Sequence, residues 1–462
     1  MKAHTLIQLA AIVFITVTCA AATKPNIVFI LVDDMGWTGL STRMDKKLQD
    51  SASDFYQTPR IDALAAQSMV FSQAYSPGPM CTPSRAGILT GKTPAQLHMT
   101  TPGGGRPQSH QRLAAPAFVR ELPTSETTIA EALKQQGYAT AHFGKWHLGR
   151  GHPGQHGFDQ HDGSTGNDGY GAANASDPKD VFGITERGCK FIDEHFKLGE
   201  PFYLQLSHYA VHSPTESLKS SSDRFSKLPS GERHSKIDYA AMTYDLDTSV
   251  GRLLQKIDEL ELTDITYVVL MSDNGAPGNP RRPANAPLAA GKGSLYEGGI
   301  RVPLIIRGPG ISNGHSAVAV TGCDLLPTFC EWAGTSVEGI DGSSLVPLLS
   351  ASPSELKRQN SSLLFHYPHY GMGPLQKPQS AIIERNWKLI RDLETGSNQL
   401  FDLSSDISEK HDLSEKMPEK AQQMSKQLDE RLKQAGAQMP TQNPTFDPAS
   451  SAPIRRPRGR RR

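Results

Sequence analysis

This 462-residue sequence lacks a charge excess and a long internal apolar run, and both absences narrow the classes of protein to which it can belong. It has no excess of either charge, with 48 basic and 47 acidic residues and a net charge of +1. A nucleic-acid-binding domain normally carries a basic excess, so nucleic acid is not expected as a partner. Downstream of residue 22 no apolar run approaches the ~20 residues that span a bilayer. With an ordinary hydrophobic fraction of 37%, the chain is predicted to be globular. Its length allows two or three domains of about 150 residues.

Cysteine is scarce as well, with five in the chain. Beyond the N-terminal segment the cysteines are Cys81, Cys189, Cys323 and Cys330. In an exported protein an even number of cysteines could form two disulfides. However, Cys323 and Cys330 lie in the helix-like segment CDLLPTFCEWAG, two turns apart on one side, which is too far for a bridge. We therefore expect buried free thiols there.

Residues 1–22 are predicted to be a secretory signal peptide. Lys2 provides a positive n-region, Leu6–Val17 a short apolar core, and Cys19–Ala22 a cleavage zone of small residues. A membrane anchor is the alternative, but the apolar run falls short of the ~20 residues of a transmembrane helix. A lipoprotein site at Cys19 is disfavoured because Thr18 is a poor residue before a modified cysteine. The sequence thus predicts export, to a periplasm, the extracellular space or a secretory lumen, without a stable membrane span.

Apolar runs typical of buried strands alternate with helical patterns. The runs are NIVFILVDD (26–34), PFYLQLSHYAVH (201–212), TYVVLMSDNG (266–275) and VPLIIRGPG (302–310). Amphipathic segments at 127–137 and 237–262 lie between them. This alternation predicts an α/β fold with a large, mainly parallel central sheet flanked by helices. Ligands of such sheets bind beyond the carboxyl ends of the strands.

The composition becomes more polar after residue 350. Alternating segments followed by the helix-like PEKAQQMSKQLDERLKQAG predict a smaller domain with an antiparallel sheet and a helix. We therefore divide the chain into a larger domain at 23–350, whose strand ends are expected to hold any ligand site, and a C-terminal subdomain at 351–440. Residues 441–462 end in RRPRGRRR and are expected to form a disordered basic tail, solvated rather than bound to a polyanion.

Oxygen-rich side chains end two of the apolar runs. Asp33 and Asp34 follow the first run, and Asp273 and Asn274 follow the third. Either pair alone is more typical of a loop or a helix cap. Together they provide carboxylate and amide oxygens, which suit Ca²⁺ or Mg²⁺ better than zinc.

Cations and histidines occur in other short motifs. GKWHLG contains Lys145 and His147, two residues apart and so facing one way on an extended segment. His212 ends the second apolar run, and Lys292 lies in GKGSLYEGGIRVP, which lacks the P-loop pattern. In the same segment Glu297 and Arg301 can pair with each other. Such a set suits a tetrahedral oxyanion ester, either sulfate or phosphate, and the nucleophile decides between them.

The nucleophile is suggested by a lone cysteine in a bend-rich segment, SPGPMCTPSRAGILTGK. Cys81-Thr82-Pro83-Ser84-Arg85, followed by LTG at 89–91, resembles the signature of the type I, formylglycine-dependent sulfatases of the alkaline phosphatase superfamily. The resemblance extends in family order over NIVFILVDDMGW, GKWHLG, AVHSP, SDNG, GKGSLYEGGIRVP and DGSSLVPLL, from Pro25 to Leu349. LLFHYPHYG and the NWKLI and LFDL segments resemble the C-terminal subdomain of that family.

The resemblance implies an alkaline phosphatase-like fold and a specific chemistry. A formylglycine-generating (sulfatase-maturating) enzyme would oxidise Cys81 to formylglycine, an aldehyde that is hydrated to a geminal diol. One hydroxyl attacks sulfur and displaces the alcohol; loss of the proton from the other lets the hemiacetal collapse and release sulfate. Ser84 matches a position that the modifying enzyme reads.

The resemblance also assigns roles to the strand-end residues. One Ca²⁺ would be held by side-chain oxygens of Asp33, Asp34, Asp273, Asn274 and the modified Cys81. Arg85 would position the nucleophilic oxygen, and Lys145 and Lys292 would bind sulfate oxygens. His147 resembles the base for hemiacetal collapse and His212 the acid for the leaving group. A serine near the GKWHLG segment contacts sulfate in the family, and Ser164 is a candidate here.

The resulting prediction is a secreted sulfatase that hydrolyses sulfated carbohydrate or aryl sulfate, with sulfated glycans as the expected substrates. The alternatives are a phosphodiesterase or phosphonate monoester hydrolase of the same superfamily, and a non-catalytic binder of sulfated glycans. Specificity is expected from residues 99–113, 161–176 and 366–371. In the last segment the rings of His366, Tyr367, His369 and Tyr370 could stack on a sugar or pack where the two domains meet.

Overall fold

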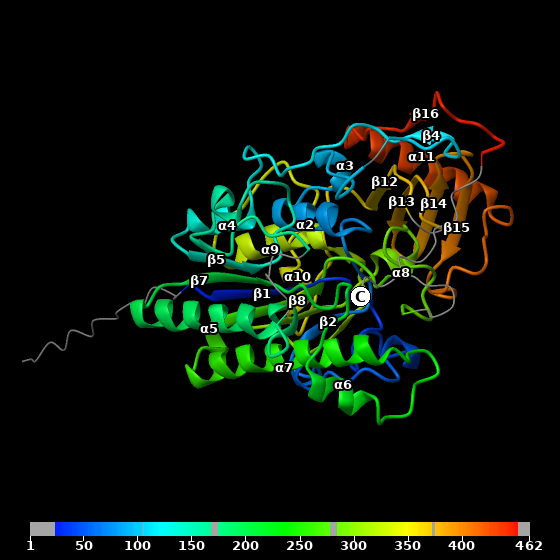
Figure 1. Cartoon of the computed structure of the whole chain (residues 1–462). Helices are drawn as coiled ribbons and strands as arrows, with labels where there is room; N and C mark the ends of the chain where they lie inside the picture. Colours follow the sequence, from blue (N-terminus) through cyan, green and yellow to red (C-terminus); the bar gives the residue numbers. More distant parts are fainter. Residues whose placement is uncertain (1–23, 105, 168–173, 278–283, 372–374, 451–462) are drawn as a thin grey trace, which may run out of the picture.

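The computed structural model describes residues 24–104, 106–167, 174–277, 284–371 and 375–450. An eight-stranded sheet forms the centre of the larger part (Figure 1). Its strands, from one edge to the other, are β10 (Gly314–Ser316), β2 (Met69–Phe71), β9 (Leu304–Arg307), β8 (Thr266–Ser272), β1 (Asn26–Val32), β7 (Phe202–Ser207), β5 (Ala139–Gly144) and β6 (Gln160–His161). Neighbours are parallel except that β9 is antiparallel to β2 and β8. The predicted mixed, mainly parallel sheet is confirmed.

Helices cover both faces of this sheet (Figure 1). One face is covered by α1 (Pro59–Ala65), α5 (Val181–Leu198), α6 (Lys219–Phe225) and α7 (Ile237–Glu259). The other is covered by α2 (Cys81–Thr90), α4 (Ile129–Lys134), α9 (Leu325–Trp332) and α10 (Val346–Leu349). Alternate residues of β1 enter the two cores, with Val28 and Ile30 on one side and Ile27 and Phe29 on the other. Burial on both faces explains why these strands read as continuous apolar runs.

Short elements complete the larger part. The strands are β3 (Ala74–Tyr75), β11 (Val320–Thr321) and β4 (Leu113–Ala114), and the helices are α3 (Pro94–Leu97) and α8 (Glu297–Ile300). Within the described ranges, 3₁₀ helices lie at Gln49–Ser51, Pro153–His156, Pro178–Asp180, Thr263–Ile265 and Gly322–Asp324. Cys323 and Cys330 are free and buried, as their helical spacing predicts.

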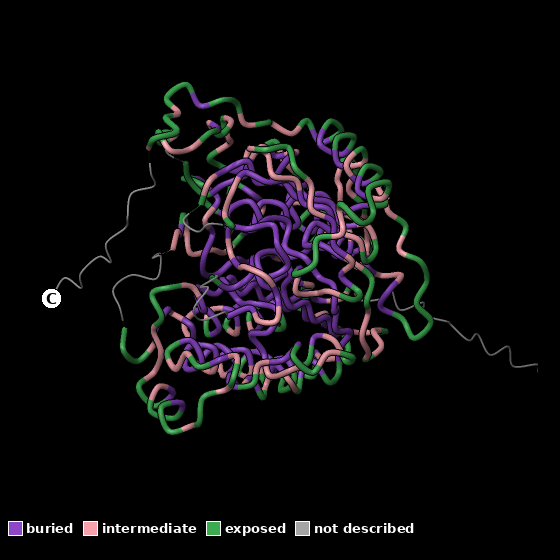
Figure 2. Tube along the Cα trace, turned by 90° about the vertical axis from the view of Figure 1, so that its right-hand side faces the viewer, coloured by how far each residue is buried: buried purple, intermediate pink, exposed green. Residues whose placement is uncertain are grey.

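A four-stranded antiparallel sheet forms the C-terminal part (Figure 1). It contains β12 (Leu363–Tyr367), β13 (Gln379–Glu384), β14 (Trp387–Asp392) and β15 (Asn398–Asp402), paired in chain order. One face, including Leu364, packs against α11 (Pro418–Gln434). The other face, including Phe365, packs against Tyr75 and Leu295 of the larger part. The sheet is therefore covered on both sides. Buried residues fill the interior of the protein, and exposed segments lie at its periphery (Figure 2).

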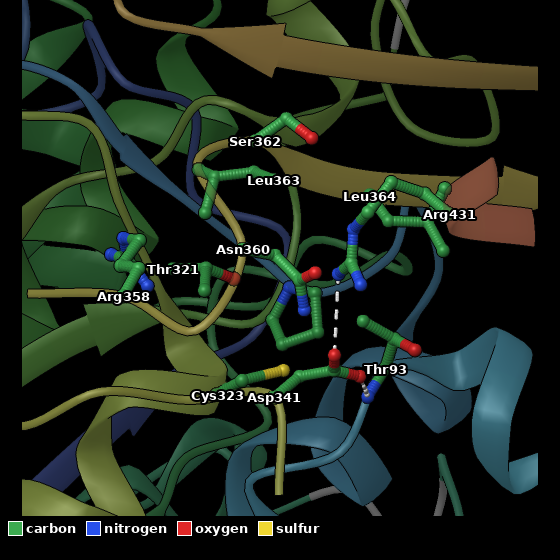
Figure 3. Close-up of a pocket in the computed structure, with 11 residues that line it drawn as sticks. Thr93, Thr321, Cys323, Asp341, Arg358, Asn360, Ser362, Leu363, Leu364 and Arg431 are labelled. Carbon is green, nitrogen blue, oxygen red and sulfur yellow. Dashed lines mark hydrogen bonds and ion pairs between the residues drawn. The ribbon is translucent and has the colours of Figure 1, made fainter. Parts of the chain in front are cut away.

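Ion pairs also cross this junction. Arg431 of α11 lies 3.2 Å from Asp341, in the wall of a small pocket that Cys323 and Thr93 also line (Figure 3). The pocket volume of about 20 Å³ corresponds to about one water molecule. It belongs to the packing between the two parts.

Residues 441–450, which we expected in the disordered tail, instead pack on the protein. Strand β16 (Thr441–Gln442) pairs antiparallel with β4, and Asn443 is buried with its side chain bonded to the carbonyls of Gln108 and Gln111. The polar composition of this segment did not reveal the edge that it covers. Residues 451–462 and the predicted signal peptide at 1–22 lie outside the described residues. Within the described ranges, no helix is long and apolar enough to cross a membrane.

Candidate active site

The parallel strands β8, β1, β7 and β5 are neighbours in the sheet, and their carboxyl ends lie side by side. Val32 pairs with Ser272, and Ser207 pairs with both Leu31 and Gly144, so the strand ends are in register. The predicted site segments leave the sheet immediately beyond these residues. Because parallel strands place their carboxyl ends together, residues separated by more than 200 positions in the chain meet here.

Cys81 is the first residue of α2 and is 2% exposed. Its sulfur lies 3.4 Å from Asp33 Oδ1 and 3.1 Å from Lys292 Nζ. Burial, followed by the charge of Asp33, raises the pKa of the Cys81 thiol to about 12, against the attraction of Lys145 and Lys292. The N-terminus of a helix favours negative charge at this position. The thiol itself is nevertheless held in its protonated form.

Three cations contact three carboxylates around Cys81. Their shortest pairs are Arg85 NH2 with Asp273 at 2.8 Å, Lys145 with Asp33 at 2.5 Å and Lys292 with Asp34 at 2.5 Å. Arg85 also donates to the Lys145 carbonyl at 2.7 Å. All six side chains are at most 14% exposed, so water screens them little.

The pKa values of the buried Asp33 and Asp273 are shifted in opposite directions. Burial alone would raise the pKa of Asp33, but the charges of Lys145 and Arg85 outweigh it and hold that pKa far below its usual value. Burial and the neighbouring Asp33 charge raise the pKa of Asp273. Asp33 is therefore the permanent anion of the pair.

The carboxylates are suitable for a metal ion. Ligand atoms of Asp33, Asp34, Cys81 and Asp273 all lie within 4.8 Å of one another. The Asn274 amide donates through Nδ2 to Asp34 at 2.7 Å, whereas its buried Oδ1 has no hydrogen-bond partner in the part of the chain that the structure describes. An unsatisfied amide oxygen beside three carboxylates is a ligand set of the kind that Ca²⁺ prefers.

The backbone at Asp34 adopts a left-handed conformation, with φ of 61°. A non-glycine residue in this region is uncommon and is sustained by its surroundings. The Asp34 carbonyl accepts from the Tyr239 hydroxyl at 3.2 Å, and the Asp34 amide donates to Asp273 at 3.2 Å. Tyr239 lies in α7, whose amphipathic pattern gives no sign of this role, so sequence reasoning missed it.

The two predicted histidines lie at the rim of the cluster. His212 Nε2 is 3.8 Å from Asp34 Oδ2, and burial is the main reason that the pKa of His212 is lowered. His147 has φ of 57°, and its carbonyl accepts from Thr82 at 2.8 Å. Burial, then the charges of Lys145 and Arg85, lower the pKa of His147 to about 3. Both rings are therefore neutral near pH 7.

The loop after β6 supports His147 through its neighbour Thr165. The His147 amide donates to the Thr165 carbonyl at 2.8 Å, and the Trp146 amide donates to the Thr165 hydroxyl at 2.8 Å. Ser164, the predicted sulfate contact, is exposed and donates to the Gly151 carbonyl at 2.6 Å. The Ser164 hydroxyl is thus bonded to the backbone that precedes β6, and no sequence signal distinguished Ser164 from Thr165.

Lys292 lies at the cluster because its loop packs closely against the backbone that follows Asp273. The Lys292 amide donates to the Ala276 carbonyl at 3.0 Å. A Cβ atom at Gly275 would lie 1.9 Å from the Gly298 carbonyl oxygen, so only glycine permits this contact. The glycine of SDNG thereby joins the Asp273 loop to the lysine loop.

Glu297 and Arg301 pair at 3.0 Å, as the sequence predicts. The pair belongs to a larger buried network, because Lys388 of β14 lies 2.8 Å from both Glu297 and Glu409. Tyr75 also donates to Glu297, at 3.0 Å. The network connects the C-terminal sheet to the loop that bears Lys292.

Comparison with known proteins agrees with this architecture. The Sulfatase family model matches residues 25–335, and a model described as N-sulphoglucosamine sulphohydrolase, C-terminal, matches residues 291–438. The chain is 32% identical to arylsulfatase A of Homo sapiens, over 76% of this chain and 72% of the relative. It is 29% identical to a sulfatase of Formosa agariphila, over 86% and 85% of the two chains.

A solved structure extends the similarity to the whole fold. The crystal structure of Ps i-CgsB in complex with k-i-k-neocarrahexaose superposes with a TM-score of 0.73 and 26% identity, covering 92% of this chain and 94% of the other. The family match covers the strand-end cluster and the segment that contains Cys81. The chain therefore belongs to the sulfatase family, and its reaction is the hydrolysis of sulfate esters.

Proposed function

We propose that this chain is an exported sulfatase that removes sulfate from saccharides, with a formylglycine made from Cys81 and one bound Ca²⁺. The observation that carries the proposal is the environment of Cys81. The Cys81 sulfur, at the first residue of α2, lies 3.1 Å from Lys292 Nζ and 3.4 Å from Asp33 Oδ1. A position near Lys292, Lys145 and Arg85, beside carboxylates that suit a metal ion, fits an oxygen nucleophile and the sulfate that it attacks. In the structure the sulfur of Cys81 stands in for that oxygen.

The chain's own residues divide the work of binding and proton transfer. Lys145 and Lys292 bind the sulfate oxygens and stabilise the negative charge that develops on them. Arg85, fixed by Asp273 at 2.8 Å, holds the nucleophilic oxygen of residue 81. His212 at the rim, in its protonated form, gives a proton to the leaving oxygen, and neutral His147 takes one when sulfate is released.

Two groups would complete the site. Formylglycine supplies a hydrated aldehyde, whose second hydroxyl provides a route for releasing sulfate that serine or cysteine lacks. Ca²⁺ would be held by Asp33, Asp34, Asp273 and Asn274, and supplies positive charge for sulfate and for the oxygen of residue 81.

Two observations favour saccharide substrates. The Ps i-CgsB structure, with 26% identity, contains an oligosaccharide. The signal-peptide pattern of residues 1–22 favours a substrate outside the cytoplasm, such as a sulfated polymer or its fragments.

Mass spectrometry tests the modification. The protein is co-expressed with a formylglycine-generating enzyme, and the peptide that contains residue 81 is analysed beside the same peptide from Cys81→Ser. We expect an aldehyde in the wild type and sulfate release that scales with the aldehyde fraction. Unmodified cysteine in fully active protein would overturn the proposal.

A substrate panel tests the saccharide class. Released sulfate or phosphate is measured with defined sulfated saccharides, a simple aryl sulfate, a phosphodiester and a phosphonate monoester. We expect higher kcat/KM on at least one sulfated saccharide than on the aryl sulfate. Preference for the phosphodiester or the phosphonate would assign the alternative function instead.

A further inference from the structure

The segment HYPHYG at the end of β12 offers polar rings whose role the sequence leaves open. His366 is fully used inside the C-terminal part. Its Nδ1 lies 2.7 Å from Ser380 Oγ and its Nε2 lies 3.0 Å from the Gln438 carbonyl. His369 is held across the junction, with Nε2 2.7 Å from Thr100 Oγ1. Both histidines therefore serve packing.

Tyr370 is also committed to the protein. Its hydroxyl accepts from the Leu113 amide at 3.1 Å and donates to Glu394 at 2.5 Å. Glu394 lies in the connection between β14 and β15 of the C-terminal sheet. The hydroxyl of Tyr370 is thus unavailable to a ligand.

Tyr367 differs from these three residues. Its ring is buried, with 3% of the residue exposed, in the cluster that contains Leu295. Its hydroxyl makes no hydrogen bond to any residue of the described ranges. The hydroxyl oxygen is also not fully enclosed by the protein. A buried tyrosine normally satisfies its hydroxyl, so an unpaired hydroxyl that still reaches solvent points to an external partner.

Tyr367 lies beside the candidate active site. It faces the same way as Phe365, towards Leu295, and Met80, which precedes Cys81, packs against this cluster. Beyond β12, Gln376 donates to the Lys292 carbonyl at 2.5 Å, so the same hairpin contacts the lysine loop. Burial raises the pKa of Tyr367 to about 12 and the nearby charge of Lys292 opposes it.

We propose that Tyr367 is a specificity-determining residue whose hydroxyl hydrogen-bonds the sugar that bears the sulfate ester. The inference rests on the proposed saccharide specificity and assigns it a contact. The hydroxyl is neutral throughout the working pH range and can both donate to and accept from a sugar hydroxyl. The ring is held in place by His369, at a centroid distance of 5.4 Å. The contact is made with the leaving group, so it contributes to binding rather than to the chemistry at sulfur.

The test compares two substrates in Tyr367→Phe, which keeps the ring and removes only the hydroxyl. On the best sulfated saccharide, KM is expected to rise roughly 3- to 10-fold with kcat within twofold, the effect of one lost hydrogen bond. On an aryl sulfate whose ring has no hydroxyl, both constants are expected to stay within twofold. Activity on the aryl sulfate also reports that the variant folds and retains its site.

Tyr370→Phe is the matched control, because its hydroxyl bonds only to the protein in the described residues. It is expected to leave the ratio of the two substrates unchanged. Equal losses of Tyr367→Phe on both substrates, or none on the saccharide, would overturn the inference while leaving the saccharide sulfatase intact. A wild type active only on the aryl sulfate would instead overturn the saccharide assignment and the inference with it.

Discussion

Lys292 Nζ lies 3.1 Å from the sulfur of Cys81. The same ammonium group lies 2.5 Å from Asp34 Oδ1, so one lysine connects the nucleophile position with a candidate metal ligand. Its side chain is 14% exposed, which leaves it accessible to a bound sulfate. Arg85 is fixed by Asp273 and the Lys145 carbonyl, whereas Lys292 can exchange its carboxylate for the substrate.

Lys292→Met is therefore expected to reduce kcat/KM about 10²- to 10³-fold, the usual effect of removing one group that stabilises transition-state charge. The melting temperature should also fall, because Lys292→Met leaves the buried Asp34 carboxylate with the Asn274 amide but without its cation. The two proteins are therefore compared at a temperature at which both are folded. Lys377→Met is the matched control, since Lys377 is 43% exposed and pairs at 3.5 Å with Asp392. Activity of Lys292→Met within threefold of the wild type would remove Lys292 from the mechanism.

Asp273→Asn is expected to abolish both calcium binding and turnover. Ca²⁺ that binds only the native state at 100 times its dissociation constant stabilises the protein by about 2.7 kcal/mol. Calorimetry of the chelated wild type should show this gain on adding Ca²⁺, and Asp273→Asn should not. Asp223→Asn, on the exposed surface of α6, should respond like the wild type. Full turnover by chelated protein with no metal by elemental analysis would contradict the assignment.

His212 should determine the alkaline limb of the pH profile. An acid catalyst must be protonated, and burial lowers the pKa of His212 below its usual 6.5. Thus kcat/KM is expected to fall as the pH rises through a value below 6.5, while His147, with a pKa of about 3, stays neutral. His212→Gln should be slow and lack this limb. The control His411→Gln, at an exposed histidine, should keep the limb unchanged. If His212→Gln also keeps it, the limb belongs to another group.

Much of the site could be predicted because it lies at strand ends. A buried parallel strand reads as a continuous apolar run, and the polar residues that follow it must lie at the sheet edge. Asp33, His212 and Asp273 follow β1, β7 and β8 in this way. Asp33 lies close to Cys81 and His212 in one group of potential ligands and to Asp34, Cys81 and Asp273 in another. The register between neighbouring strands then determines which of these residues lie at the same level.

The supporting residues could not be predicted, because their roles depend on backbone contacts made at a distance. Tyr239 bonds the Asp34 carbonyl from α7, and Thr165 bonds the amides of Trp146 and His147. Such contacts leave no periodicity in the sequence. The antiparallel direction of β9 likewise depends on its tertiary neighbours, since VPLIIRGPG has the same composition as a parallel strand.

The buried ion network makes the last prediction, on stability. Lys388 lies 2.8 Å from both Glu297 and Glu409, and all three side chains are fully buried. Lys388→Met leaves two carboxylates without their shared cation, so it should lower the free energy of unfolding by about 3–5 kcal/mol. Lys420→Met, whose partner Glu384 is 3.8 Å away near the surface, should cost less than about 1 kcal/mol.

The cost of Lys388→Met should also depend on pH. Burial, and then the neighbouring Glu297, raises the pKa of Glu409 to about 7 from its usual 4.5, despite the attraction of Lys388. Across this window the unfolded chain loses its proton before the native state, so the contribution of Glu409 to stability falls as the pH rises. Without Lys388 the penalty should be larger at pH 8 than at pH 5, and Glu409→Gln in the same chain should recover part of it. Denaturant unfolding at both pH values measures this difference, and a cost equal to that of Lys420→Met would show that the network contributes nothing to stability.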